Sequence, residues 1–108
     1  MAEAPPPVKE RARKWVKTAK ESLEKLERAT ERCDYYSASV NLGEIEVAEG
    51  AVLELARRYT EDYEVQDLWR EVVDVAGEGR IARHRFAFGC ECKPRGSDPA
   101  IRHLVSRG

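Results

Sequence analysis

Apolar and small residues in the first third of the chain recur every three or four positions. Between residues 12 and 33 the series is Ala12, Trp15, Ala19, Leu23, Leu26, Thr30 and Cys33. This period matches the turn of an α-helix, and lysines and glutamates fill the opposite side. It predicts a first helix of about 25 residues that starts at Val8.

Two further stripes of the same period follow. The second comprises Leu42, Ile45, Ala48, Val52, Leu55, Ala56 and Tyr59, and the third comprises Val65, Leu68, Trp69, Val72, Val75 and Ala76. Asp34 or Ser37 could cap the second helix, and residues 60–62 could cap the third. Gly77 and Gly79 are expected to end the third helix.

Residues 80–88 fit two patterns. Ala82, His84, Phe86 and Phe88 alternate as in a strand, but no partner strand exists in the sequence, which favours a kinked continuation of the third helix. Residues 89–96 are expected to form a loop, and Asp98-Pro99 is typical of the start of a short last helix. The predicted fold is all-α, an antiparallel bundle of three main helices with a short C-terminal helix. Residues 1–7 are expected to form a proline-rich tail and residues 8–108 a single helical-bundle domain.

Length and composition restrict the function classes. A chain of 108 residues, 42% hydrophobic and 36% charged, is expected to form one domain with a modest core. It has no apolar run of about 18 residues and no signal-peptide pattern at its start, which predicts a cytoplasmic protein without membrane contact. Arg outnumbers Lys by 13 to 6, and Asn, Gln and Met occur once each. This composition favours a thermophilic source, archaeal or bacterial.

Charge is segregated along the chain. Residues 44–78 carry a net charge of -8 and residues 79–108 a net charge of +5. The C-terminal basic segment mixes cations with aromatic rings, as in surfaces that bind phosphates and stack on bases. Its candidate nucleic-acid-binding residues are Arg80, Arg83, His84, Arg85, Lys93 and Arg95. The alternative is charge complementarity within the bundle or across an oligomer interface, and the overall pI near 6.2 argues against a dedicated nucleic-acid binder.

Metal and redox chemistry have little support in the sequence. The weak candidates for a zinc site are Cys90, Cys92, His84 and His103, but their spacing matches no standard zinc arrangement. A disulfide from Cys33 to Cys90 or Cys92 is a comparable possibility, and buried or incidental thiols are the favoured alternative. Glu46 and Glu49 are interpreted as a solvent-facing acidic stripe. No cofactor is expected.

Several residues predict tight packing or self-association. Gly43 and Gly50 lie seven positions apart on the second predicted helix, and their cost of about 1 kcal/mol each suggests close approach of another backbone. Trp15, Tyr59 and Trp69 supply large apolar groups to a small core that could extend across subunits. A homo-oligomer, or another protein partner, is therefore expected.

The layout from Ala19-Lys20-Glu21-Ser22-Leu23 through Cys33-Asp34-Tyr35-Tyr36 to Leu55-Ala56 resembles the helical hairpins of HEPN-type domains. It is also similar to small archaeal helical families with an Asp-Tyr turn and to tetratricopeptide-like hairpins. Nuclease members of the HEPN group carry Arg, four to six residues, then His. Here three residues separate Arg80 from His84, and seven separate Arg95 from His103. The resemblance therefore implies a helical domain without catalysis.

Three functions follow as hypotheses. The favoured one is a non-enzymatic interaction or assembly module that self-associates. The first alternative is a small nucleic-acid-associated subunit that uses the C-terminal basic segment. The second is a degenerate HEPN-like nuclease, for which His84 would be the only sensible acid-base residue.

Overall fold

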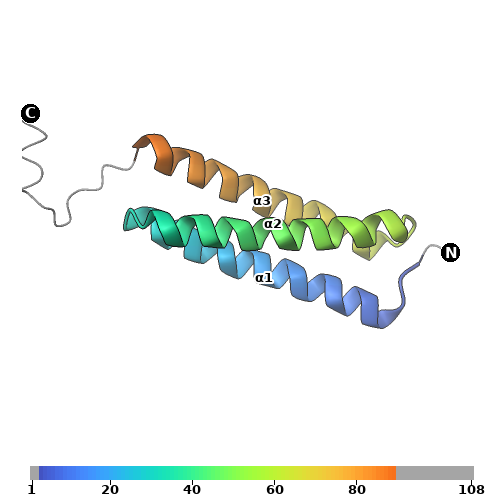
Figure 1. Ribbon diagram of the computed structural model, residues 1–108. Coiled ribbons are helices and arrows are strands. Elements are labelled where there is room, and N and C mark those ends of the chain that lie inside the picture. Colours follow the sequence, from blue (N-terminus) through green and yellow to red (C-terminus); the bar gives the residue numbers. More distant parts are fainter. Residues whose placement is uncertain (1–2, 90–108) are drawn as a thin grey trace, which may run out of the picture.

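The computed structural model describes residues 3–89, with side chains up to Arg85. Three helices lie side by side: α1 (Pro6–Glu31), α2 (Tyr35–Arg58) and α3 (Tyr63–Gly89). α2 begins at the end of the bundle where α1 finishes, and α3 begins at the opposite end (Figure 1). The prediction of three main helices and no strand is confirmed for residues 3–89. The short helix predicted after Asp98 lies outside the described residues.

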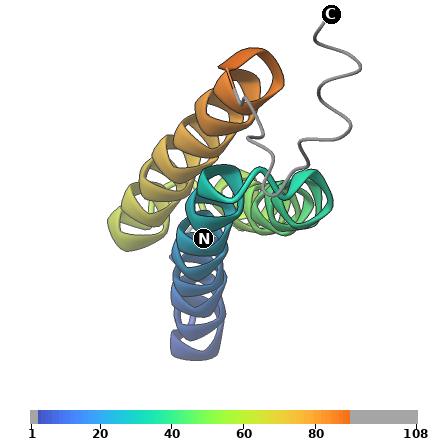
Figure 2. The same ribbon diagram turned by 90° about the vertical axis from the view of Figure 1, so that its left-hand side faces the viewer.

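The core runs along the axis of the bundle, where each helix contacts the other two. Viewed end-on, the helices surround this core (Figure 2). Its largest fully buried side chains are Leu26, Ile45, Val52, Val65 and Val72, all of them members of the predicted stripes. Trp15 and Trp69 are half-buried and pack against it. The helical period of the sequence therefore identifies the core correctly.

Residues 4–7 take part in the fold. α1 begins at Pro6, two residues earlier than predicted, with proline in its first turn, where a missing N–H costs nothing. Ala4 is buried and packs with Val8, Ala56 and Val65 in a second apolar cluster. Residues 4–7, expected to be part of a tail, thus lead directly from this cluster into α1.

The turn between α1 and α2 is closed by backbone hydrogen bonds. The N–H groups of Asp34 and Cys33 donate to the carbonyls of Ala29 at 2.8 Å and Thr30 at 3.1 Å. This pattern places Cys33 in the left-handed region, at a φ of 56°, where glycine is usual. The Asp34 side chain accepts the N–H of Ser37 at 3.1 Å, which confirms Asp34 as a cap of α2.

α3 does not end at Gly77 and Gly79, and that prediction is wrong. The helix continues to Gly89, which confirms the helical interpretation of residues 80–88. Burial of Val72, Val75 and Ala76 holds α3 against the core and offsets the roughly 1 kcal/mol cost of each glycine. Gly79 also has a packing role: a Cβ on it would meet the Cδ1 atoms of Ile45 at 3.2 Å and Leu42 at 3.3 Å.

Candidate protein-interaction surface

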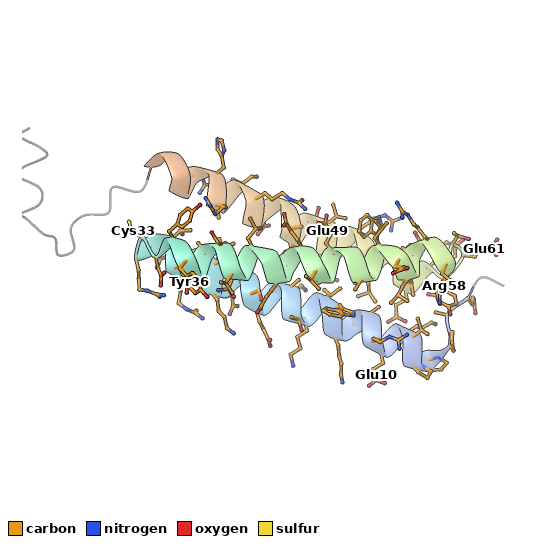
Figure 3. All side chains as sticks on the ribbon, viewed as in Figure 1. Glu10, Cys33, Tyr36, Glu49, Arg58 and Glu61 are labelled. Atoms are coloured by element: carbon orange, nitrogen blue, oxygen red, sulfur yellow. The ribbon has the colours of Figure 1, made fainter. Side chains whose placement is uncertain are left out.

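α2 carries small and apolar residues on the side away from the core. Tyr36, Val40, Gly43, Val47 and Gly50 recur at alternating spacings of four and three, so they share one face of the helix. We call these five residues the outer stripe of α2. Tyr36 is 77% exposed, Val40 41% and Val47 61%. Figure 3 shows Tyr36 near the start of α2, with Arg58 at its other end.

The outer stripe borders a groove between α2 and α1. The groove has a volume of about 400 Å³ and is lined mainly by apolar surface from Trp15, Thr18, Val40, Gly43, Glu44 and Val47. Trp15 also lines a second hollow of about 220 Å³, together with Arg11, Ala51 and Arg58. One half-buried indole therefore lines both hollows.

Local sequence explains why α2 is apolar on two sides. Ala38, Ile45, Ala48 and Val52 point into the core, and the outer stripe lies on the opposite side of the same helix. A helix that covers only one core usually carries charged residues on its outer side. Apolar surface opposite the core is a feature of helices that contact something else.

The glycines of the outer stripe have no packing role inside the described part of the chain. A Cβ added at Gly43 or Gly50 would meet nothing within 4 Å. The close helix contact that the sequence predicts at these positions is therefore not made between α2 and either α1 or α3. Each glycine still costs the helix about 1 kcal/mol relative to alanine.

Tyr59 and Trp69, the other predicted interface residues, pack inside their own chain. Both lie against the apolar cluster of Ala4, Val8, Ala56 and Val65. The carbonyl of Tyr59 also accepts a hydrogen bond from the Gln66 side chain at 3.1 Å. Tyr36, Val40 and Val47 were not predicted as surface candidates from the sequence. Their helical spacing relative to Gly43 and Gly50 could have indicated that all five residues share one face of α2.

Arg80, one of the predicted nucleic-acid-binding residues, forms ion pairs with two acidic residues of α2. Its guanidinium donates to Glu49 Oε1 at 2.6 Å and to Glu46 Oε2 at 3.1 Å. The hydrogen bond to Glu49 is the main cause that raises the pKa of Arg80 above its usual value, against the opposing effect of burial. Glu46 and Glu49, interpreted as a solvent-facing stripe, instead link α2 to α3.

The remaining predicted nucleic-acid-binding residues are divided between two regions. Arg83 lies over the ring of Tyr35, with 4.3 Å between its Cζ atom and the ring centroid. His84 and Arg85 are exposed on α3. Lys93 and Arg95 lie outside the described residues. The structure therefore does not assemble the six residues into one described surface.

Basic residues of α1 are paired with Asp62, just ahead of α3, and with acidic residues of α3. Lys9 lies 3.5 Å from Asp62, and Arg13 donates to Glu64 at 2.6 Å. Further along the same two helices, Lys20 of α1 pairs with Glu71 of α3. Part of the charge segregation seen in the sequence thus serves contacts within the bundle.

The metal candidates of the sequence are not brought together in the described region. Among residues 3–89 no group of three His, Cys, Asp or Glu side chains could hold a metal ion. Cys33 is disulfide-bonded, so the expectation of incidental thiols is wrong for this residue. Cys90, Cys92 and His103 lie outside the described residues.

No helix of the described chain is both long enough and apolar enough to cross a bilayer. Comparisons with models of protein families, with curated proteins and with solved structures found no match.

Proposed function

We propose that this chain is a non-enzymatic interaction module that associates with a second copy of itself through the face formed by α1 and α2. The observation that carries the proposal is the outward exposure of Val40 and Val47 beside an apolar groove. Single exposed apolar residues, such as Ile81 on α3, are ordinary on a protein surface. Val40 and Val47 instead line one groove with Trp15, and Tyr36 lies on the same face of α2, an arrangement typical of an interface.

The finer features of the proposal rest on the sequence. The sequence predicts an antiparallel bundle with a short C-terminal helix and a cytoplasmic location, and its charge-rich composition supports a thermophilic, archaeal origin. The HEPN-type resemblance fits a helical assembly domain. The spacing of Arg80 and His84 departs from the nuclease signature, which supports a role without catalysis.

The mass of the protein in solution tests the proposal directly. Size exclusion with light scattering reads mass independently of the elongated shape of a helical bundle. We expect one defined oligomer at micromolar concentration, with a dimer near twice the 12.3 kDa of the chain. A monomer at every concentration up to several hundred micromolar would overturn self-association.

Binding to nucleic acid is the competing outcome. It would appear as affinity for labelled RNA or DNA that falls steeply with salt, since phosphate contacts release counterions. Arg83→Glu combined with Arg85→Glu would then abolish it. That result, together with a monomeric protein, would replace the proposed function with the first alternative. An activity lost on His84→Ala would favour the second.

A further inference from the structure

We propose that the disulfide of Cys33 is a redox-sensitive clasp. The bond holds the last turns of α3, residues 80–89, against the turn between α1 and α2. Its reduction by a dithiol releases these turns while the rest of the bundle stays folded. The clasp acts within one chain, so it does not depend on the proposed self-association.

The other cysteine of this bond follows α3 closely in the sequence. Cys33 is disulfide-bonded, and the chain contains only two other cysteines, Cys90 and Cys92. Within one chain the bond therefore joins the α1–α2 turn to a residue one or three positions after Gly89, where α3 ends. It spans 57 or 59 positions of the sequence. Such a bond ties the end of α3 to a turn that is distant in the sequence.

Contacts between described side chains bring the end of α3 to the same turn. Arg83 lies over the ring of Tyr35, the first residue of α2, with 4.3 Å between its Cζ atom and the ring centroid. Ala82 and Cys33 pack against one core cluster. Figure 3 shows Cys33 at the end of the bundle where α3 finishes. The bond therefore joins two parts of the chain that lie close together.

Burial along α3 stops at Gly79. Val75, Ala76 and Gly79 are buried, whereas none of residues 80–85 is. Gly77 and Gly79 also lower the helical propensity just before this segment. A stretch with little burial opens at a lower free energy than the core of a fold. The end of α3 is therefore suited to local release.

The polar contacts of this segment lie at the surface. Arg80 pairs with Glu46 and Glu49, and its side chain is 47% exposed. Arg83 lies over Tyr35, which is 58% exposed. Exposed ion pairs and cation–π contacts contribute modestly to stability. These contacts position the segment, and the covalent bond keeps it in place when they open.

The opposite end of the bundle does not depend on this bond. There the buried carboxylate of Asp62 accepts the N–H groups of Ala4 at 2.8 Å and Val65 at 3.1 Å. The chain itself also joins α2 to α3 at this end. Reduction is therefore expected to release α3 at one end only, while its first turns stay packed.

The release requires a two-electron reduction. A thiolate of the dithiol attacks one sulfur of the bond, forms a mixed disulfide with that cysteine and frees the other cysteine, whose thiolate takes up a proton. The second thiol of the reductant then displaces the first cysteine, which is protonated in turn. The dithiol becomes a disulfide, and the protein gains two electrons and two protons. Cys33 is half-buried, which favours access by a reductant.

The first experiment counts thiols in the full chain. Alkylation with iodoacetamide and mass spectrometry should find one reactive cysteine in the oxidised protein. Millimolar dithiothreitol, without denaturant, should raise the number to three. A bond that is reduced only in denaturant would overturn the clasp, as would three thiols before reduction. A non-reducing gel that shows two chains linked through Cys33 would also overturn it.

The second experiment compares trypsin cleavage at two arginines of α3. Arg83 lies in the segment that is released, and Arg70 is the matched control, since its side chain is 70% exposed on the same helix. In dithiothreitol, cleavage after Arg83 should become at least about tenfold faster and exceed cleavage after Arg70 at least about tenfold, because proteolysis follows the population of the open form.

The two sites separate local release from a loss of overall stability, which removal of a long disulfide loop also causes. Equal cleavage rates at Arg70 and Arg83 in the reductant would show that the bond stabilises the whole fold, and would overturn the clasp. No acceleration at Arg83 would overturn it as well.

Cysteine variants test whether the reductant acts through this bond. Cys33→Ser, and Cys90→Ser combined with Cys92→Ser, both remove the disulfide. Without reductant, both should be cleaved after Arg83 as fast as the reduced wild type, and dithiothreitol should change neither rate more than about twofold. The double variant leaves the α1–α2 turn unchanged, so it keeps the test valid if Cys33→Ser fails to fold. Protection of Arg83 in the folded double variant would overturn the clasp.

Discussion

The carboxylate of Asp62 accepts the backbone N–H of Ala4 at 2.8 Å, across 58 positions of the sequence. The same side chain accepts the N–H of Val65 at 3.1 Å in the first turn of α3 and lies 3.5 Å from the ammonium of Lys9. It is 3% exposed. One buried carboxylate thus caps α3 and fixes the chain ahead of α1.

Asp62→Ala should lower the free energy of unfolding by about 2 kcal/mol or more. It removes a helix cap and leaves the N–H of Ala4 buried without an acceptor. Urea denaturation followed by circular dichroism measures the change. The matched control is Asp67→Ala, which breaks only an exposed pair with Arg70 and should cost less than about 0.5 kcal/mol. Equal effects of the two substitutions would show that Asp62 does not anchor the N-terminal residues.

Stability should fall in acid partly through Asp62. Burial alone would raise its pKa, but hydrogen bonds from Ala4 and Val65 and the charge of Lys9 lower the pKa of Asp62 below its usual value. A carboxyl whose folded pKa lies below the unfolded value near 3.9 stabilises the fold above that pH. The contribution disappears as pH falls through the lowered folded pKa. Denaturation between about pH 2 and 6 should therefore show a smaller acid loss in Asp62→Asn than in the wild type, and superimposable profiles would contradict this assignment.

Cys33→Gly should be more stable than Cys33→Ser by about 1 kcal/mol when both are measured in a reductant. The φ of 56° at this position is strained for any residue with a Cβ and natural for glycine. In the reductant the wild type also lacks its disulfide, so all three proteins are compared without that bond. Thermal or urea unfolding of the three proteins provides the test, and an equal stability of the two variants would mean that the turn relaxes without cost.

Gly77 and Gly79 of α3 should respond to substitution in opposite ways. Gly77→Ala should stabilise the fold by up to about 1 kcal/mol, because an added Cβ meets nothing within 4 Å and alanine favours the helix. Gly79→Leu should destabilise it by about 1–3 kcal/mol, because its side chain would press on Ile45 and Leu42. Chemical denaturation of both variants measures the difference. Stabilisation by Gly79→Leu would show that α2 and α3 can separate without penalty.

The helices and the core were predictable because both follow from local periodicity. Val72 and Ile45, for example, recur at helical spacing and are fully buried. Asp34 and residues 60–62 were recognisable as helix caps in the sequence. In the structure the side chains of Asp34 and Asp62 accept backbone N–H groups in the first turns of α2 and α3. The end of α3 was not predictable, since Gly77 and Gly79 have the sequence signature of a stop. Only the position of α2 shows that Gly79 is a contact site.

The candidate surface was harder to predict because it, too, depends on how the helices are placed relative to one another. The glycine pair at 43 and 50 indicated a close contact, but the sequence could not show whether the contact lies inside the chain or outside it. The Glu46–Arg80–Glu49 cluster was likewise hidden, because it joins residues more than 30 positions apart. Charge counts alone suggested a free basic segment, whereas one of its arginines is bound within the bundle.

The hydrogen bond between Ala4 and Asp62 also makes residues ahead of the first helix part of the unit that folds. A truncation that begins at the first residue of α1 would keep every helix and still expose the apolar cluster around Val65. A cleavable tag should therefore be attached ahead of Glu3, which is exposed. The minimal folding unit starts before the first helix does.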